Sequence, residues 1–348
     1  MKRLLLIVFV MINISDISAQ DIHYTQFYNS PLSLNPALTG FFRQDFRISA
    51  NYRTQWKQAK ATFETVSLGG EVNFPVKPER LDRVGVGVWF LNDDMGDKII
   101  RNKTFFTSIG YNRFLDHSRK HKIGVGLQGG YVRKGIDYSS LQFGNQYADY
   151  QYDPNLASNE DMSRNTFAYF NINAGIYGDF KLNKDLSVHT GISWFNINKP
   201  KESFRGTVIS TDLNKLRNRF LWTGGAVYQI DPKFSLHPDV MLMFQSGARD
   251  WNLGTAVGYK VGADNPALIK LGVWYRTRDA VIAYAGLNYK NFQLGLSYDK
   301  TISGLNDVKK SSHVNDNAMI GAVEVSLIYV GFFKRALPGK QTIPCGIF

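Results

Sequence analysis

Cysteine and long hydrophobic runs are nearly absent from this chain of 348 residues. The single cysteine, Cys345, excludes an intramolecular disulfide. No window holds the roughly 18 consecutive apolar residues that a transmembrane helix needs. The one hydrophobic run, residues 4–14, follows a basic start and precedes Ile17-Ser18-Ala19, a typical cleavage site. Residues 1–19 are therefore predicted to be a secretory signal peptide, and no cysteine follows it to carry a lipid anchor.

Motifs for catalysis and for metal binding are missing as well. No nucleophile elbow or HExxH spacing occurs. Residues 124–129 match G-x-G-x-x-G, but these glycines fall within a candidate strand and not between a strand and a helix. His117 and His121 have metal-ligand spacing but lie in a short basic turn, and the acidic segment 92–97 lacks the spacing of an EF-hand. The sequence predicts a non-enzymatic protein without a cofactor or metal site.

The charge balance is basic, with 41 Lys and Arg against 29 Asp and Glu. The basic residues are spread through candidate strands and turns and form no single stripe, so binding to nucleic acid is not expected. Contact with anionic lipid headgroups, or a basic interior, accounts for the balance. Aromatic residues are abundant (24 Phe, 18 Tyr and 6 Trp), and Tyr or Trp often lies near a candidate strand end. Membrane β-barrels carry such rings at both interfaces.

Residues 268–299 show a strict alternation of apolar and polar or small side chains. Ile269, Leu271 and Val273 begin the pattern, which resumes after 277–279 and again after 290–291. Because successive side chains of a strand point to opposite faces, each segment has one apolar face. Segments of roughly ten residues in this pattern are typical of transmembrane β-barrels. The strands of a soluble sandwich would alternate in a similar way, so the choice between a membrane barrel and a soluble sandwich depends on the rest of the chain.

Alternating segments recur along most of the chain. They are expected at about 46–53, 66–74, 84–90, 103–114, 123–131, 166–180, 185–197, 219–230, 233–246 and 250–262, at three places within 268–299, and at 318–331. Fourteen is an even count, as a closed up-and-down barrel requires. Pro238 predicts a bulge, or a strand that begins only at Asp239. We predict an all-β fold, a transmembrane up-and-down barrel of about 14 antiparallel strands in residues 45–331.

The connections between these segments alternate in length. The long ones are 92–101, 133–165, 198–218 and 301–317, and the short ones are 115–120, 181–184, 231–232, 263–266 and 290–291. If the first strand starts in the periplasm, all the long ones lie outside the cell. Outer-membrane barrels have long external loops and short periplasmic turns, whereas a soluble sandwich has no reason for this parity. With export and without spanning helices, the predicted location is the cell outer membrane.

The two ends of the mature chain do not read as strands. In residues 20–44, Asn35 and Pro36 have the chemistry of a helix N-cap and first position, and Gly40 is suited to closing the turn. We expect this segment at or in the periplasmic mouth of the barrel. Residues 332–348 are expected to form a periplasmic tail or to fold into the lumen.

The long connection 133–165 carries an unusual number of aromatic residues: Tyr138, Phe143, Tyr147, Tyr150 and Tyr152. They stand among Asn, Gln, Asp and Ser, a composition found at protein-contact surfaces. One interpretation is a partner-binding loop. The other is a lid whose rings fold back over the mouth of the barrel.

Several charged side chains alternate with apolar ones and are predicted to face the lumen: Arg47, Arg53, Glu71, Lys270, Arg276 and Glu324. In an open pore, the basic residues would favour anions. In a filled barrel, they would pair with acids such as Glu71, Asp299 and Glu324, or with the N-terminal segment.

The N-terminal third carries distinctive motifs. They are HYTQFYNSP at 23–31, with Pro31; LNPALTG at 34–40, with Asn35, Pro36 and Gly40; and YRTQW at 52–56, with Arg53 and Trp56. Further matching stretches lie at 91–93, 96–97, 143–147 and 293–299. Together they resemble the PorP/SprF family of outer-membrane proteins in the type IX secretion system of Bacteroidetes. The opening QFYNSPL is similar to the SprF branch.

The resemblance implies a non-enzymatic barrel that works with the secretion and gliding-motility machinery. Such a barrel would assist export and surface anchoring of large adhesins through their C-terminal secretion domain. The implied partners are these cargo domains, periplasmic ring or peptidoglycan-binding components of the same system, and outer-membrane lipid. The family has no catalytic residues to transfer. The rival hypothesis is an outer-membrane channel for small hydrophobic or anionic solutes.

Overall fold

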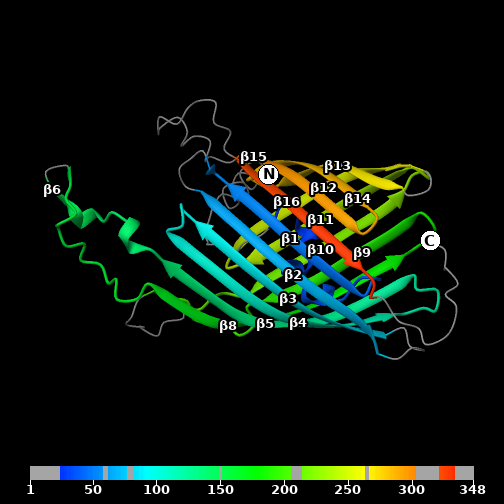
Figure 1. Cartoon of the computed structure of the whole chain (residues 1–348), viewed down its shortest axis with the longest axis horizontal. Helices are drawn as coiled ribbons and strands as arrows, with labels where there is room; N and C mark the ends of the chain where they lie inside the picture. Colours follow the sequence, from blue (N-terminus) through cyan, green and yellow to red (C-terminus); the bar gives the residue numbers. More distant parts are fainter. Residues whose placement is uncertain are drawn as a thin grey trace, which may run out of the picture.

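Fourteen antiparallel strands form one closed barrel in the computed structural model (Figure 1). The structure describes residues 24–57, 62–76, 82–148, 151–204, 214–262, 266–302 and 321–333. The barrel strands are β1 (Phe46–Gln55), β2 (Phe63–Pro75), β3 (Asp82–Met95), β4 (Ile100–Phe114), β5 (His121–Ile136), β8 (Thr166–Lys181), β9 (Leu186–Phe195), β10 (Arg219–Gln229), β11 (Phe234–Gln245), β12 (Ala248–Val261), β13 (Ala267–Arg276), β14 (Ala280–Tyr289), β15 (Phe292–Thr301) and β16 (Gly321–Gly331). The barrel closes because β1 pairs with β2 on one side and β16 on the other. The predicted fold class is confirmed.

The two faces of the barrel wall are chemically opposite. Apolar side chains such as Ile48, Leu68 and Leu271 point outward and are about half exposed. Small polar residues such as Ser67 and Asn112 point inward and are buried. A water-soluble protein would place its apolar face inside, so this distribution is that of a barrel whose outer face meets lipid. Among the described residues, no helix is long and apolar enough to cross a membrane.

Two local predictions are wrong. Strands β3 and β4 stay paired as far as Met95 and Ile100, so the expected long connection 92–101 is a four-residue turn. Its polar residues extend the strands, and Asp93 accepts a hydrogen bond from Thr65 Oγ1 at 2.6 Å inside the barrel. Pro238 causes no bulge: β11 begins at Phe234 and pairs with β12 without interruption. The ladder to β10 omits this position, where a proline has no N–H to donate.

The ends of the barrel differ. One end, here called the loop end, carries the connections β5–β8 (137–165), β9–β10 (196–218) and β15–β16 (302–320). The opposite end, here called the turn end, carries 115–120, 182–185, 230–233 and 290–291. Because β1 runs from the turn end to the loop end, the predicted parity of long and short connections holds apart from the β3–β4 turn.

Residues 24–45, here called the plug, lie inside the barrel. They contain three short helical turns, η1 (Phe27–Asn29), α2 (Pro31–Leu34) and η2 (Pro36–Leu38). Thr25 bonds to Asp299 near the loop end of β15, and the Asp45 amide bonds to the Gly331 carbonyl at the turn end of β16. The plug therefore crosses the lumen from one end to the other and is not confined to one mouth of the barrel.

Candidate functional site

The plug is shaped by its prolines and by Asn35. Pro31 occupies the first turn of α2, and Pro36 the first turn of η2. Asn35 caps η2, its side-chain oxygen accepting from the Ala37 amide at 2.9 Å. Gly40 then turns the chain with φ +67°, a conformation that favours glycine. These are the residues of the N-terminal motif, and their local chemistry lets the plug fold compactly enough to fit the lumen.

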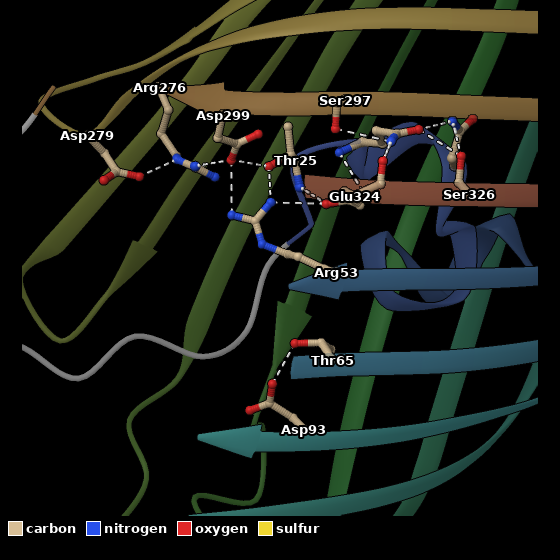
Figure 2. Close-up of polar contacts among 12 residues, drawn as sticks. Thr25, Arg53, Thr65, Asp93, Arg276, Asp279, Ser297, Asp299, Glu324 and Ser326 are labelled. Atoms are coloured by element: carbon tan, nitrogen blue, oxygen red, sulfur yellow. Dashed lines mark hydrogen bonds and ion pairs between the residues drawn. The ribbon is translucent and has the colours of Figure 1, made fainter. Parts of the chain in front are cut away.

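An ion-pair network anchors the plug near the loop end (Figure 2). Arg53 lies 3.0 Å from Asp299 and 3.1 Å from Glu324, and it also donates to the Thr25 hydroxyl. The Thr25 hydroxyl in turn donates to Asp299 at 2.6 Å, and its amide to Glu324 at 2.8 Å. Glu324 is fully buried and also accepts from the Gln26 amide at 3.0 Å. One guanidinium thus joins the plug to β1, β15 and β16.

The same network continues along the wall. Arg276 on β13 lies 2.7 Å from Asp299 and 2.6 Å from Asp279, which follows in the β13–β14 turn. Asp299 is therefore shared by two arginines and one hydroxyl. The attraction within a buried ion pair offsets the free-energy cost of removing both charges from water only when the remaining polar atoms are also hydrogen-bonded. Most of them are hydrogen-bonded here.

Amide side chains hold the first half of the plug to β15 and β16. Gln26 donates to Ser297 at 3.1 Å and to the Glu324 carbonyl at 2.9 Å. Asn29 donates to Ser326 at 2.9 Å. These bonds satisfy buried polar groups of both the plug and the wall, and they fix the position of η1 along the barrel axis.

The opposite wall holds the second half of the plug. Asn35 donates to the Ile176 and Ile192 carbonyls at 3.0 and 3.3 Å, and Ser193 donates to the Leu34 carbonyl at 2.9 Å. A Cβ placed on Gly126 would collide with the Pro36 carbonyl, and one on Gly175 with the Asn35 side chain. The glycines that match a nucleotide fingerprint thus include one that lets the plug approach the backbone of β5.

A second ion pair holds the plug toward the turn end. Arg47 and Glu71 lie 2.8 Å apart, and Glu71 also accepts from the Gly40 amide at 2.9 Å. Arg47 donates to the Leu38 carbonyl at 3.0 Å. Arg53, Arg47, Glu71 and Glu324 therefore all bind the plug directly.

Lys270 occupies a different environment. It lines a cavity of about 230 Å³ together with His189, His237 and Asp239, and among these His189 lies 2.9 Å from Asp239. An apolar cluster adjoins this space, in which Phe27 and Leu34 of the plug pack with Trp274 and Tyr284. Most of the predicted lumen charges thus form one system with the plug, while Lys270 stands apart.

The connection 137–165 extends away from the barrel, and a small hairpin of β6 (Tyr147–Ala148) and β7 (Gln151–Tyr152) lies near its middle (Figure 1). Tyr147 is half exposed, and its ring lies 5.6 Å from that of Tyr152. Tyr138 and Phe143 are partly buried within the connection, and Tyr150 lies outside the described residues. The backbone of this connection thus runs away from the barrel mouth and does not lie across it (Figure 1).

The remaining candidates occupy structural positions. Trp56 follows β1, where its amide bonds to the Gly321 carbonyl at 3.0 Å and its ring meets Phe63 edge-on. His117 is exposed in the β4–β5 turn, which Asp116 organises: bonds from Ser118 and from the amides of the turn lower the pKa of this carboxyl to about 2. In the described part of the chain, no three His, Cys, Asp or Glu side chains are grouped as a metal ion requires.

Parts of the predicted organisation lie outside the described residues. These are the signal peptide 1–19, residues 20–23 of the N-terminal segment, and residues 334–348 of the tail, including Cys345. Phe333 is described, and its amide bonds to Asp45 at 3.1 Å.

The fold resembles several solved outer-membrane barrels. They include the toluene transporter TbuX of Ralstonia pickettii (10% identity, TM-score 0.51, covering 88% of this chain and 94% of that one) and the toluene transporter TodX of Pseudomonas putida (11%, 0.51, 88% and 94%). The CymD monoaromatic hydrocarbon channel is also similar (11%, 0.50, 88% and 93%). At such identities the likeness is one of fold.

Sequence comparison identifies the family. No curated protein sequence matches the chain. A family model described as "Type IX secretion system membrane protein PorP/SprF" matches residues 17–314. That range covers most of the barrel and the whole plug, and this family and fold are those of an outer-membrane barrel and not of a known enzyme family. The chain belongs to the PorP/SprF family of type IX secretion system membrane proteins.

Proposed function

We propose that this protein is a filled, non-enzymatic barrel that assists export and surface anchoring of large adhesins by holding their C-terminal secretion domain at the loop end. The observation that carries this proposal is the plug, which is bonded to the wall at both ends of the lumen. A barrel that held its plug this firmly would be a poor conduit and a stable platform. In this view the precursor carries the signal peptide 1–19, and the tail 332–348 faces the periplasm.

The cavities inside the barrel favour the function of a holding platform over that of a pore. The cavity near the loop end has a volume of about 80 Å³ and is lined by residues such as Trp89, Phe106 and Asn171. The cavity around Lys270 measures about 230 Å³ and shares no lining residue with the first. Among the described residues these two spaces are small and separate, which favours a platform over a path for solutes.

The projecting connection 137–165 supplies the contact surface in this proposal. Its exposed or partly exposed Tyr147, Tyr152 and Phe143 combine aromatic area with neighbouring amide and hydroxyl groups, the composition of protein-binding loops. Outer-membrane barrels place their long loops outside the cell, which is where a displayed adhesin would be held. The turn end would then face periplasmic ring or peptidoglycan-binding components.

The experiment is a mild-detergent pull-down of the tagged barrel from its native membrane, followed by mass spectrometry. We expect a large secreted adhesin, or its C-terminal domain, to come with the wild type. A triple variant in which Phe143, Tyr147 and Tyr152 become serine should lose it. A matched variant with Tyr147→Phe and Tyr152→Phe, which keeps the rings, should retain it. Equal recovery with all three proteins would contradict the proposed contact.

The second candidate function is a channel for small hydrophobic solutes. It is favoured by the likeness of fold to proteins described as toluene transporters and a hydrocarbon channel. Single-channel recording in planar bilayers separates the two. A closed barrel supports the platform, whereas a steady open conductance of the wild-type protein supports the channel.

A further inference from the structure

A pocket of about 120 Å³ opens at the turn end, between the plug, the β4–β5 turn and the end of β8. Its lining holds five cations and one carboxylate: Arg43, Arg119, Lys120, Lys122 and Lys181 against Asp179. This concentration differs from the loop-end network, where Arg53 and Arg276 each contact two carboxylates. The charges of the pocket are therefore not balanced by the wall around them.

Lys122 is the centre of this imbalance. Its side chain points into the lumen from the start of β5 and is only 7% exposed. The ammonium lies 4.0 Å from the centre of the Phe41 ring and 5.5 Å from that of Phe114. Within the described part of the chain, it has neither an ion pair nor a hydrogen bond. Cation–π contact recovers only a fraction of what full hydration would supply, so an ammonium with this little access to water is costly to keep charged.

The neighbouring acids are already engaged. Glu71 holds Arg47 and the Gly40 amide, and Asp116 holds the amides of its own turn. Asp82 lies 3.6 Å from Arg113 on the outer side of the wall. Other cations stand close to Lys122, namely Arg43, Arg47 and Arg83, and act on it electrostatically. Asp179 alone cannot offset this group.

We propose that this pocket is a phosphate-binding site. Lys122 would supply a desolvated point charge at its floor, and Arg43 and Arg119 planar donors at its rim. A phosphate group carries enough charge and enough acceptor oxygens to engage several of these cations at once, and it would relieve the uncompensated ammonium. The ligand is either free phosphate or the headgroup of a phospholipid at this end of the barrel. The site does not depend on what the outer loops bind.

The test uses the full-length protein in an uncharged detergent at low salt. Calorimetric titration with inorganic phosphate, and separately with dihexanoyl phosphatidylglycerol, measures the two sources. We expect saturable binding of at least one. Lys122→Gln should weaken it about tenfold or more, since one desolvated charge contact is lost. Lys122→Arg should bind like the wild type, as should Lys103→Gln, which removes an exposed lysine from the outer face of β4.

Each outcome bears on the proposal. Tighter binding of the lipid assigns the site to a headgroup, and equal or tighter binding of inorganic phosphate assigns it to the free anion. Absence of saturable binding with both probes overturns the site. So does binding by Lys122→Gln at wild-type strength. Heat-modifiable migration on gels verifies that each variant is a folded barrel before it is titrated.

Discussion

Arg53 and Asp299 lie 3.0 Å apart inside the lumen, although 246 positions separate them in the sequence. Arg53 is on β1 and Asp299 on β15, and between these strands lies β16, which contributes Glu324. The pairing therefore spans the seam where the first and last strands of the barrel meet. The same carboxylates bond to Thr25, so the contacts that join the strands at the seam also hold the plug.

The first prediction concerns this seam. Arg53→Met would leave Asp299 and Glu324 buried with less compensation, and breaking such a pair typically costs about 3–5 kcal/mol. We expect a markedly lower temperature for loss of the folded band in heat-modifiability gels. Arg278→Met, at an exposed position in the β13–β14 turn, should migrate like the wild type. A wild-type midpoint for Arg53→Met would show that the network does not stabilise the barrel.

The second prediction concerns the fit of the plug. Gly126→Ala would place a Cβ against the Pro36 carbonyl, so the plug must shift or leave the wall. We expect raised single-channel conductance or increased protease sensitivity of residues 24–45. Gly144→Ala is the matched control, because nothing lies within 4 Å of a Cβ there. If both alanine variants remain as closed and as protected as the wild type, the plug is less tightly held than its contacts indicate.

The barrel wall was predictable because its code is local. The alternation along one strand specifies which side chains face outward and which face the lumen. This assignment does not depend on which strands lie beside it. The Asn35-Pro36 cap is similarly local and was read from two adjacent residues. The wrong prediction of a long connection at 92–101 has a physical reason. Strands that extend beyond the apolar band of the barrel carry polar residues there, and in a sequence such residues resemble those of a loop.

The path of the plug was not predictable in the same way. Its partners, such as Ser297, Ser326 and Ile176, are small or ordinary wall residues far away in the sequence. One signal is present in the sequence: Gly126 and Gly175 lie within strands, at positions where an added Cβ would meet the plug. Glycine on the inner face of a strand also marks close approach by another backbone, and that meaning needs the structure to become visible.

The third prediction concerns orientation. In a background where Cys345 is replaced by serine, Asn155→Cys in the projecting connection should react with a membrane-impermeant maleimide on intact cells. Lys290→Cys, in the β14–β15 turn at the opposite end, should react only after the outer membrane is permeabilised. Both positions are exposed in the structure, so the difference reports the side of the membrane. The reverse pattern would place the turn end outside and remove the basis for a cargo-holding loop.

The last prediction asks whether the plug must move. Asn29 and Ser326 are joined by a hydrogen bond of 2.9 Å between their side chains, so cysteines at both positions, again without Cys345, would place two thiols at this contact. Non-reducing gels first establish that oxidation forms a disulfide that ties η1 to β16. Under the proposed function the lumen never opens, and oxidised cells should display adhesin as well as reduced ones. Asn29→Cys alone controls for loss of the amide, which also bonds to Gln26. A loss of display that appears only in the oxidised double variant, and is restored by reductant, would instead make movement of the plug part of the export step.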